Sequence, residues 1–145
     1  MGADENITIV LETFRAVERR DRQRLNELYH PEVEFRWPPS LVSTLGSERV
    51  ELWDELQPTA AEREMDPRVV AAAGDEVVVL WHWRAASPSG AYVAEPVLGL
   101  YRVRDGKFAR AQKFFFDAAA VAAFIARVKR ERAGAPGEAT STAPV

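Results

Sequence analysis

Glu95 is the carboxylate that this sequence places best for acid–base chemistry. It stands in a strand-like segment, on the same side of the alternation as Val97, Gly99 and Tyr101. This alternation predicts an inward-facing carboxylate in an apolar cavity, where desolvation raises the pKa toward the range that suits a general acid or base. Pro96 follows directly, however, and a bulge at this proline would place Glu95 on the opposite face. The sequence leaves open whether Glu95 is a catalytic or a structural carboxylate.

Aromatic and neutral polar side chains form a second group of candidates, and together they suit a flat hydrophobic ligand. Gln112 alternates with Phe108 and Phe114, so we expect its amide to point inward and orient a ligand carbonyl. Tyr29, at the end of a helical segment, either donates to a ligand or satisfies a backbone carbonyl. The alternative for the aromatic residues is that they only fill the core. The expected ligand-binding residues are Tyr29, Trp37, Trp53, Trp81, Tyr101, Gln112 and Phe114.

The composition excludes several kinds of site and partner. The chain has 145 residues, a formal net charge of −3, no cysteine and two histidines. Thiolate metal sites and disulfides are thereby excluded, and we expect neither a metal nor a cofactor. The acidic balance predicts no nucleic-acid partner, and no apolar run is long enough for a membrane span. The N-terminus lacks a signal-peptide pattern, so we expect a cytoplasmic protein.

Helical patterns dominate the first half of the chain. Apolar residues recur at helical spacing over 7–17, and a second helix capped by Asp21 follows. Residues 33–37 alternate between polar and apolar, which predicts a short strand. Ser47 is expected to cap a third helix, which includes Trp53 and is broken by the proline at position 58.

The second half is typical of a strand meander followed by a helix. Asp105 and Gly106 predict a hairpin, because a type I′ turn needs positive φ and this pair tolerates it. Asp117 is expected to cap the last helix. We expect one α+β domain over 1–133 and, from its small, polar and proline-containing residues, a disordered tail over 134–145. The expected strands span 68–73, 76–86, 91–104 and 107–116.

The strand over 76–86 has two apolar faces. The face that carries Trp81 is the bulkier, and we expect it to pack against the helices. Val78 and Leu80 lie on the other face together with His82. Because an apolar sheet face implies a partner, we expect a homodimer through this face, with His82 in a structural role.

The order of these elements resembles the NTF2-like superfamily, and within it the SnoaL-like and ketosteroid-isomerase-like branch. The resemblance rests on Leu-Tyr-His-Pro-Glu-Val over 28–33 and on Arg-Asp-Gly-Lys-Phe over 104–108 in the last hairpin. It implies a cone, in which a strongly curved, mostly antiparallel sheet wraps around three helices of the N-terminal half plus a C-terminal helix. It also implies a pocket at the open end of the cone and a homodimer.

The catalytic residues of these relatives do not carry over to this chain. By resemblance, Trp37 stands at the position of the aspartate base of ketosteroid isomerases, and Gly99 at the position of their protonated aspartate. Gln112 and Lys113 stand where SnoaL-like cyclases have an acid on the last strand, and neither is a carboxylate.

Two hypotheses about function follow. The first is an aromatic-lined pocket for a small hydrophobic molecule, with cofactor-independent proton transfer of isomerase, cyclase or dehydratase type. The second is a non-catalytic small-molecule-binding or dimerisation domain that has lost the acid and base residues of its relatives. Glu95 and the tryptophans favour the first hypothesis, and the absent aspartates favour the second.

Overall fold

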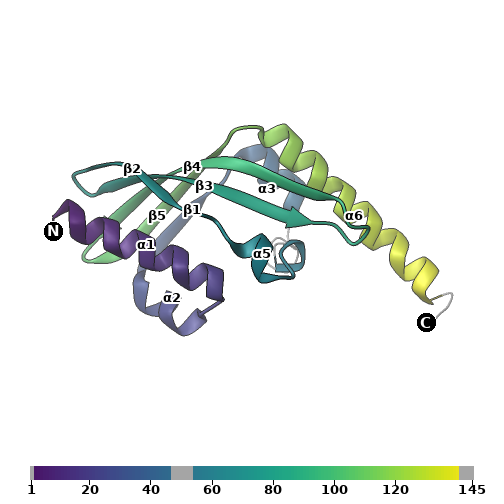
Figure 1. Cartoon of the computed structure of the whole chain (residues 1–145), viewed down its shortest axis with the longest axis horizontal. Helices are drawn as coiled ribbons and strands as arrows, with labels where there is room; N and C mark the ends of the chain where they lie inside the picture. Colours follow the sequence, from purple (N-terminus) through teal and green to yellow (C-terminus); the bar gives the residue numbers. More distant parts are fainter. Residues whose placement is uncertain (1, 47–53, 141–145) are drawn as a thin grey trace.

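Five strands form one sheet in the order β1-β5-β4-β3-β2 in a computed structural model that describes residues 2–46 and 54–140. The strands are β1 (Tyr29–Arg36), β2 (Arg68–Ala73), β3 (Glu76–Ala86), β4 (Tyr92–Arg104) and β5 (Lys107–Phe115). The helices are α1 (Ala3–Arg19), α2 (Arg22–Leu28), α3 (Pro39–Leu45), α5 (Ala60–Arg63) and α6 (Ala118–Thr140). Figure 1 shows the twisted sheet with α1 and α2 at one end and α6 at the other. The expected α+β class is confirmed.

The meander predicted for the second half of the chain is confirmed. Strands β2 to β5 pair antiparallel in sequence order, and β1 joins the sheet in parallel beside β5. The turn between β4 and β5 has positive φ at both Asp105 (55°) and Gly106 (71°), as a type I′ hairpin requires. This tight turn fixes the register that brings the middle of β5 against the middle of β4.

The core lies between the inner face of the sheet and the helices. Along β3 every second side chain is buried, and Trp81 and Trp83 extend this buried row toward the end of the strand. Phe14 of α1 packs edge-on against Trp81, with 5.8 Å between ring centroids. Asp117 caps α6 as expected, because its Oδ1 accepts a hydrogen bond from the backbone N–H of Ala120 at 2.9 Å. The apolar stripe of α6 is thereby held on the core.

A β-bulge in β5 reverses the alternation that the sequence predicted there. The pairing shifts between Arg102 and Val103, and Phe108 and Ala109 are both buried as a result. Beyond this point Ala111, Lys113 and Phe115 face inward, while Gln112 and Phe114 pair with the outward-facing Leu100 and Leu98. The prediction that Gln112 and Phe114 point into the core side of the sheet is therefore wrong.

The helices differ from the prediction at two places. The helix α3 was not expected, and proline 39 is its first residue, a position that suits proline. The short helix α5 was not expected. The predicted cap Ser47 and Trp53 lie outside the described residues.

Helix α6 continues to Thr140, beyond residue 133, and the division into a domain and a disordered tail stays a prediction. Within residues 2–46 and 54–140, no helix is both long and apolar enough to cross a bilayer.

Candidate functional site

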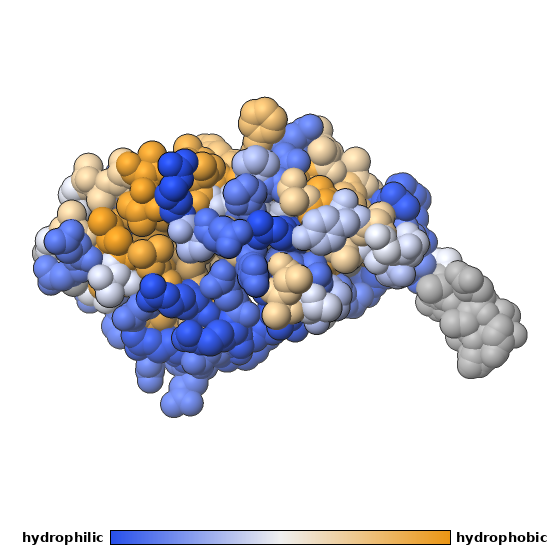
Figure 2. All heavy atoms as spheres, in the orientation of Figure 1, coloured by the Kyte–Doolittle hydropathy of each residue, from blue (hydrophilic) through white to orange (hydrophobic). Residues whose placement is uncertain are grey.

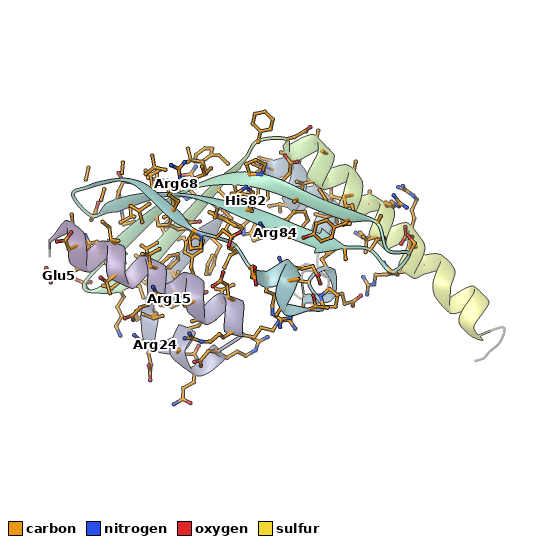
Figure 3. The ribbon with its side chains drawn as sticks, viewed as in Figure 1. Glu5, Arg15, Arg24, Arg68, His82 and Arg84 are labelled. Carbon is orange, nitrogen blue, oxygen red and sulfur yellow. The ribbon has the colours of Figure 1, made fainter. Side chains whose placement is uncertain are left out.

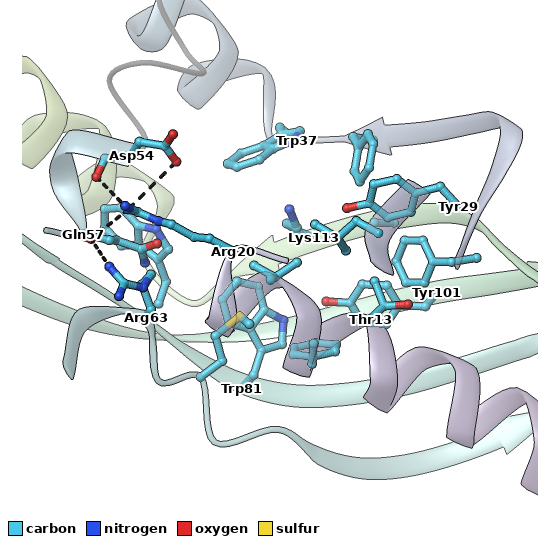
Figure 4. A pocket seen from close by; sticks show the side chains of 18 of the residues that line it. Thr13, Arg20, Tyr29, Trp37, Asp54, Gln57, Arg63, Trp81, Tyr101 and Lys113 are labelled. Carbon is cyan, nitrogen blue, oxygen red and sulfur yellow. Dashed lines mark hydrogen bonds and ion pairs between the residues drawn. The ribbon is translucent and has the colours of Figure 1, made fainter. Parts of the chain in front are cut away.

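A cavity of about 770 Å³ lies between the inner face of the sheet and the junction of α1 with α2 (Figure 4). Its aromatic walls come from elements far apart in the sequence: α1, both ends of β1, and the middle of β3, β4 and β5. Four of the expected ligand-binding residues are among those that line it: Tyr29, Trp37, Trp81 and Tyr101. A cavity of this size and lining suits a small, flat organic molecule.

Lys113 lines this cavity with an ionisable side chain, and it was not among the expected site residues. The bulge in β5 turns its side chain inward, and its Nζ lies 4.0 Å from the centre of the Trp37 ring and 5.9 Å from that of Phe35. Burial lowers the pKa of the Lys113 ammonium from 10.5 to about 8. Among the described residues no hydrogen bond or ion pair reaches this ammonium, and its contacts there are with aromatic faces.

Tyr101 lines the cavity together with Lys113, and its ring lies over Gly99. Gly99 pairs with Lys113 across the strands, and a Cβ built on Gly99 would lie only 2.1 Å from the hydroxyl oxygen of Tyr101. The glycine thus leaves the space that the tyrosine ring occupies. Burial raises the pKa of the Tyr101 hydroxyl far above its usual range, and the nearby indole N–H of Trp81 offsets this rise only in part. Tyr101 therefore stays a neutral hydroxyl at physiological pH.

The mouth of the cavity is built by arginines that bind backbone carbonyls. Arg20, whose left-handed conformation (φ 54°) ends α1, donates to the carbonyl oxygens of Asp54 at 3.0 Å and Gln57 at 2.9 Å. Arg63 of α5 donates to the same Gln57 carbonyl at 3.1 Å. The Asp54 carboxylate lies 4.0 Å from Arg20 and 3.8 Å from Arg22. Figure 4 shows these side chains meeting at one end of the cavity.

Three expected site residues do not line the cavity. Gln112 and Phe114 face the outer side of the sheet, and Phe114 is half exposed. Glu95 does face inward, as its alternation predicted, but its Oε1 accepts a hydrogen bond from the backbone N–H of Asp117 at 3.1 Å. Glu95 thus supports the start of α6. Trp53 belongs to the segment outside the described residues.

Neither histidine belongs to the cavity. His82 is on the outer sheet face, and His30 lies near the β4–β5 turn, 3.3 Å from Asp105. Within the described part of the chain, no cluster of three or more histidine, aspartate or glutamate side chains is placed to hold a metal ion. The described cavity offers the amine of Lys113 and the phenols of Tyr29 and Tyr101 among apolar rings, with arginines and the Asp54 carboxylate at its mouth.

Comparison with known proteins defines the class to which this arrangement belongs. The solved structure of TerC co-crystallised with polyporic acid has a TM-score of 0.68 and 23% identity, and the match covers 83% of this chain and 98% of TerC. An NTF2-like protein of unknown function from Burkholderia pseudomallei has a TM-score of 0.60 and 19% identity over 83% of this chain and 96% of that one. The fold is therefore NTF2-like, as the sequence predicted.

The family follows from the sequence itself. Residues 10–111 match the SnoaL-like domain family, and the chain belongs to that family. A putative SnoaL-like polyketide cyclase from Jannaschia sp. CCS1 has a similar structure, with a TM-score of 0.63 and 20% identity over 86% of this chain and 93% of the cyclase. No curated protein sequence matches the chain significantly.

Proposed function

We propose that this SnoaL-like protein binds a small, flat, hydrophobic molecule in the cavity between Trp37 and Tyr101. The observation that carries the proposal is the cavity itself: about 770 Å³, walled by aromatic rings from both halves of the chain. Sites for small molecules have this size and this apolar lining with a few polar groups. The neutral hydroxyls of Tyr29 and Tyr101 provide donors for a ligand carbonyl, because burial raises the pKa of each phenol.

Polyporic acid is a suitable first probe, because TerC, a protein of the same fold, was co-crystallised with it. A ligand at 100 times its dissociation constant stabilises the folded state by about 2.7 kcal/mol, which a thermal-shift assay detects. Trp37→Ala removes one wall and should weaken binding. Phe114→Ala is the matched control, because this ring lies on the outer face of the sheet and should leave the affinity unchanged. Failure of polyporic acid and related flat aromatics to stabilise the protein would contradict the proposal.

Cofactor-independent proton transfer of isomerase or cyclase type is a second candidate function. Lys113 favours it, since burial lowers the pKa of its ammonium to about 8 and an amine with a pKa near the working pH can exchange a proton with a bound ligand. Against it, Asp54 is the one carboxylate among the described lining residues, and it is paired with Arg20 and Arg22. Binding without catalysis is therefore the function that we place first.

The outer face of the sheet supports the proposal of a homodimer. Val78, Leu80 and Leu98 form neighbouring positions across β3 and β4, and Leu98 pairs with the exposed Phe114. Figure 2 shows apolar side chains gathered over part of the sheet, and Figure 3 shows His82 beside this surface. An apolar sheet surface of this kind is covered in a stable soluble protein, and a second copy of the chain is the partner that we propose.

A further inference from the structure

The cavity differs in charge from the protein as a whole. The chain carries a formal net charge of −3. Four cationic side chains line the described part of the cavity, namely Arg20, Arg22, Arg63 and Lys113, against the single carboxylate of Asp54. Concentrating one sign of charge in a cleft with apolar walls focuses the field there and attracts a ligand of the opposite sign.

Lys113 has no anionic partner among the described residues. Its Nζ lies over the ring of Trp37, whereas Arg20 and Arg63 donate hydrogen bonds to a backbone carbonyl at the mouth of the cavity. An ammonium has three N–H donors, and aromatic faces satisfy none of them as a hydrogen-bond acceptor would. The N–H groups of Lys113 are therefore available to donate to an acceptor on a bound molecule.

We infer that the ligand of this cavity is an aromatic anion, whose negatively charged oxygen binds Lys113 while its ring system lies against Trp37 and Tyr101. The oxygen belongs to a carboxylate, a phenolate or the enolate of a flat carbonyl compound. This inference rests on the proposed binding function and specifies the chemical class of its ligand. A charge-assisted hydrogen bond inside an apolar cavity gives such an anion its advantage over a neutral ring of the same shape.

Lys113 is the residue of the described cavity that we expect to change its protonation between pH 7 and pH 9. Burial raises the pKa of Tyr29, at the start of β1, and that of Tyr101, on β4, so both remain neutral. The other cationic groups that line the described cavity are Arg20, Arg22 and Arg63. Asp54 is held between two of them. An anion on the amine favours its protonated form, so binding above pH 8 takes up a proton.

The experiment compares 2-naphthoate with 2-naphthamide, two flat bicyclic molecules of nearly the same shape that differ in charge. Isothermal titration calorimetry at pH 7 measures both dissociation constants for the wild type, Lys113→Met and Lys113→Arg. Lys107→Met, which removes an exposed lysine from β5, is the matched control. We expect the wild type and the control to favour naphthoate roughly 10- to 100-fold. Lys113→Met should abolish this preference, and Lys113→Arg should retain most of it.

A second readout is the number of protons taken up on binding at pH 9, obtained by titration in buffers of different ionisation enthalpy. We expect uptake approaching one proton for naphthoate with the wild type, and none with Lys113→Met or with naphthamide. Equal affinities of the two compounds for the wild type would overturn the inference and leave the proposed pocket intact. A preference that survives in Lys113→Met would overturn the role of Lys113. Absence of binding by both compounds would contradict the proposed function itself.

Discussion

Replacing Lys113 with methionine should stabilise the folded protein at neutral pH. Methionine keeps an unbranched apolar side chain against Trp37 and removes the buried charge. Lowering the pKa of the amine from 10.5 to about 8 corresponds to a cost of about 3 kcal/mol, at about 1.4 kcal/mol per pH unit. Because water reaches this half-buried amine through the cavity, we expect a gain of about 1–3 kcal/mol in the free energy of unfolding at pH 7.

The pH dependence of this gain distinguishes it from a simple packing effect. Below pH 8 the amine is protonated in both the folded and the unfolded chain, so the wild type carries the full cost of the buried charge. As the pH rises from 8 toward 10.5, the folded state loses its proton before the unfolded state does. The cost therefore disappears over this range, and the stability of the wild type approaches that of the variant.

Urea unfolding of the wild type, Lys113→Met and the control Lys107→Met at half-unit intervals from pH 7 to pH 10 measures these differences. The control loses the exposed hydrogen bond from the Lys107 Nζ to the Glu27 carbonyl at 2.6 Å, so it should differ from the wild type by about 1 kcal/mol or less, by the same amount at each pH from about 7 to 9. A Lys113→Met variant that is less stable than the wild type at pH 7, or a gain that does not shrink above pH 8, would refute the assignment of a buried, unpaired amine.

Three further predictions concern other parts of the molecule. Val78→Glu combined with Leu80→Lys should convert the proposed dimer to a monomer in sedimentation velocity, and a wild type that is already monomeric at high micromolar concentration would contradict the assigned face. Deleting residues 134–145 should leave the melting temperature nearly unchanged, whereas a drop of several degrees would show that this segment stabilises the fold. Glu95→Gln should lower the free energy of unfolding by about 0.5–1.5 kcal/mol without changing ligand affinity, and a loss of turnover or affinity would restore Glu95 as a site residue.

Much of the fold was predictable because local signals agreed with one another. The Asp105-Gly106 turn fixed the last hairpin, the alternation of β3 identified its buried face, and Asp117 marked the start of α6. Proline 39 carried a usable signal for the start of α3 as well, because proline is common in the first turn of a helix.

The candidate site was harder to predict, because one bulge decides which residues enter it. In β5 the odd-numbered and the even-numbered residues each contain phenylalanine together with small or polar residues. The sequence pattern therefore does not show where the alternation between the two faces reverses. The extra residue at Ala109 exchanges Gln112 for Lys113 in the cavity. Gly99 was the overlooked clue, since a glycine inside a strand marks close approach of another group, here the Tyr101 hydroxyl.

A crystal structure of the protein grown with 2-naphthoate tests most directly whether the cavity binds an aromatic anion through Lys113. We expect the naphthalene ring to lie in the cavity between Trp37 and Tyr101, with a carboxylate oxygen about 2.8 Å from the Nζ of Lys113. A ligand bound instead on the outer face of the sheet, or a carboxylate directed away from Lys113 toward solvent, would contradict it.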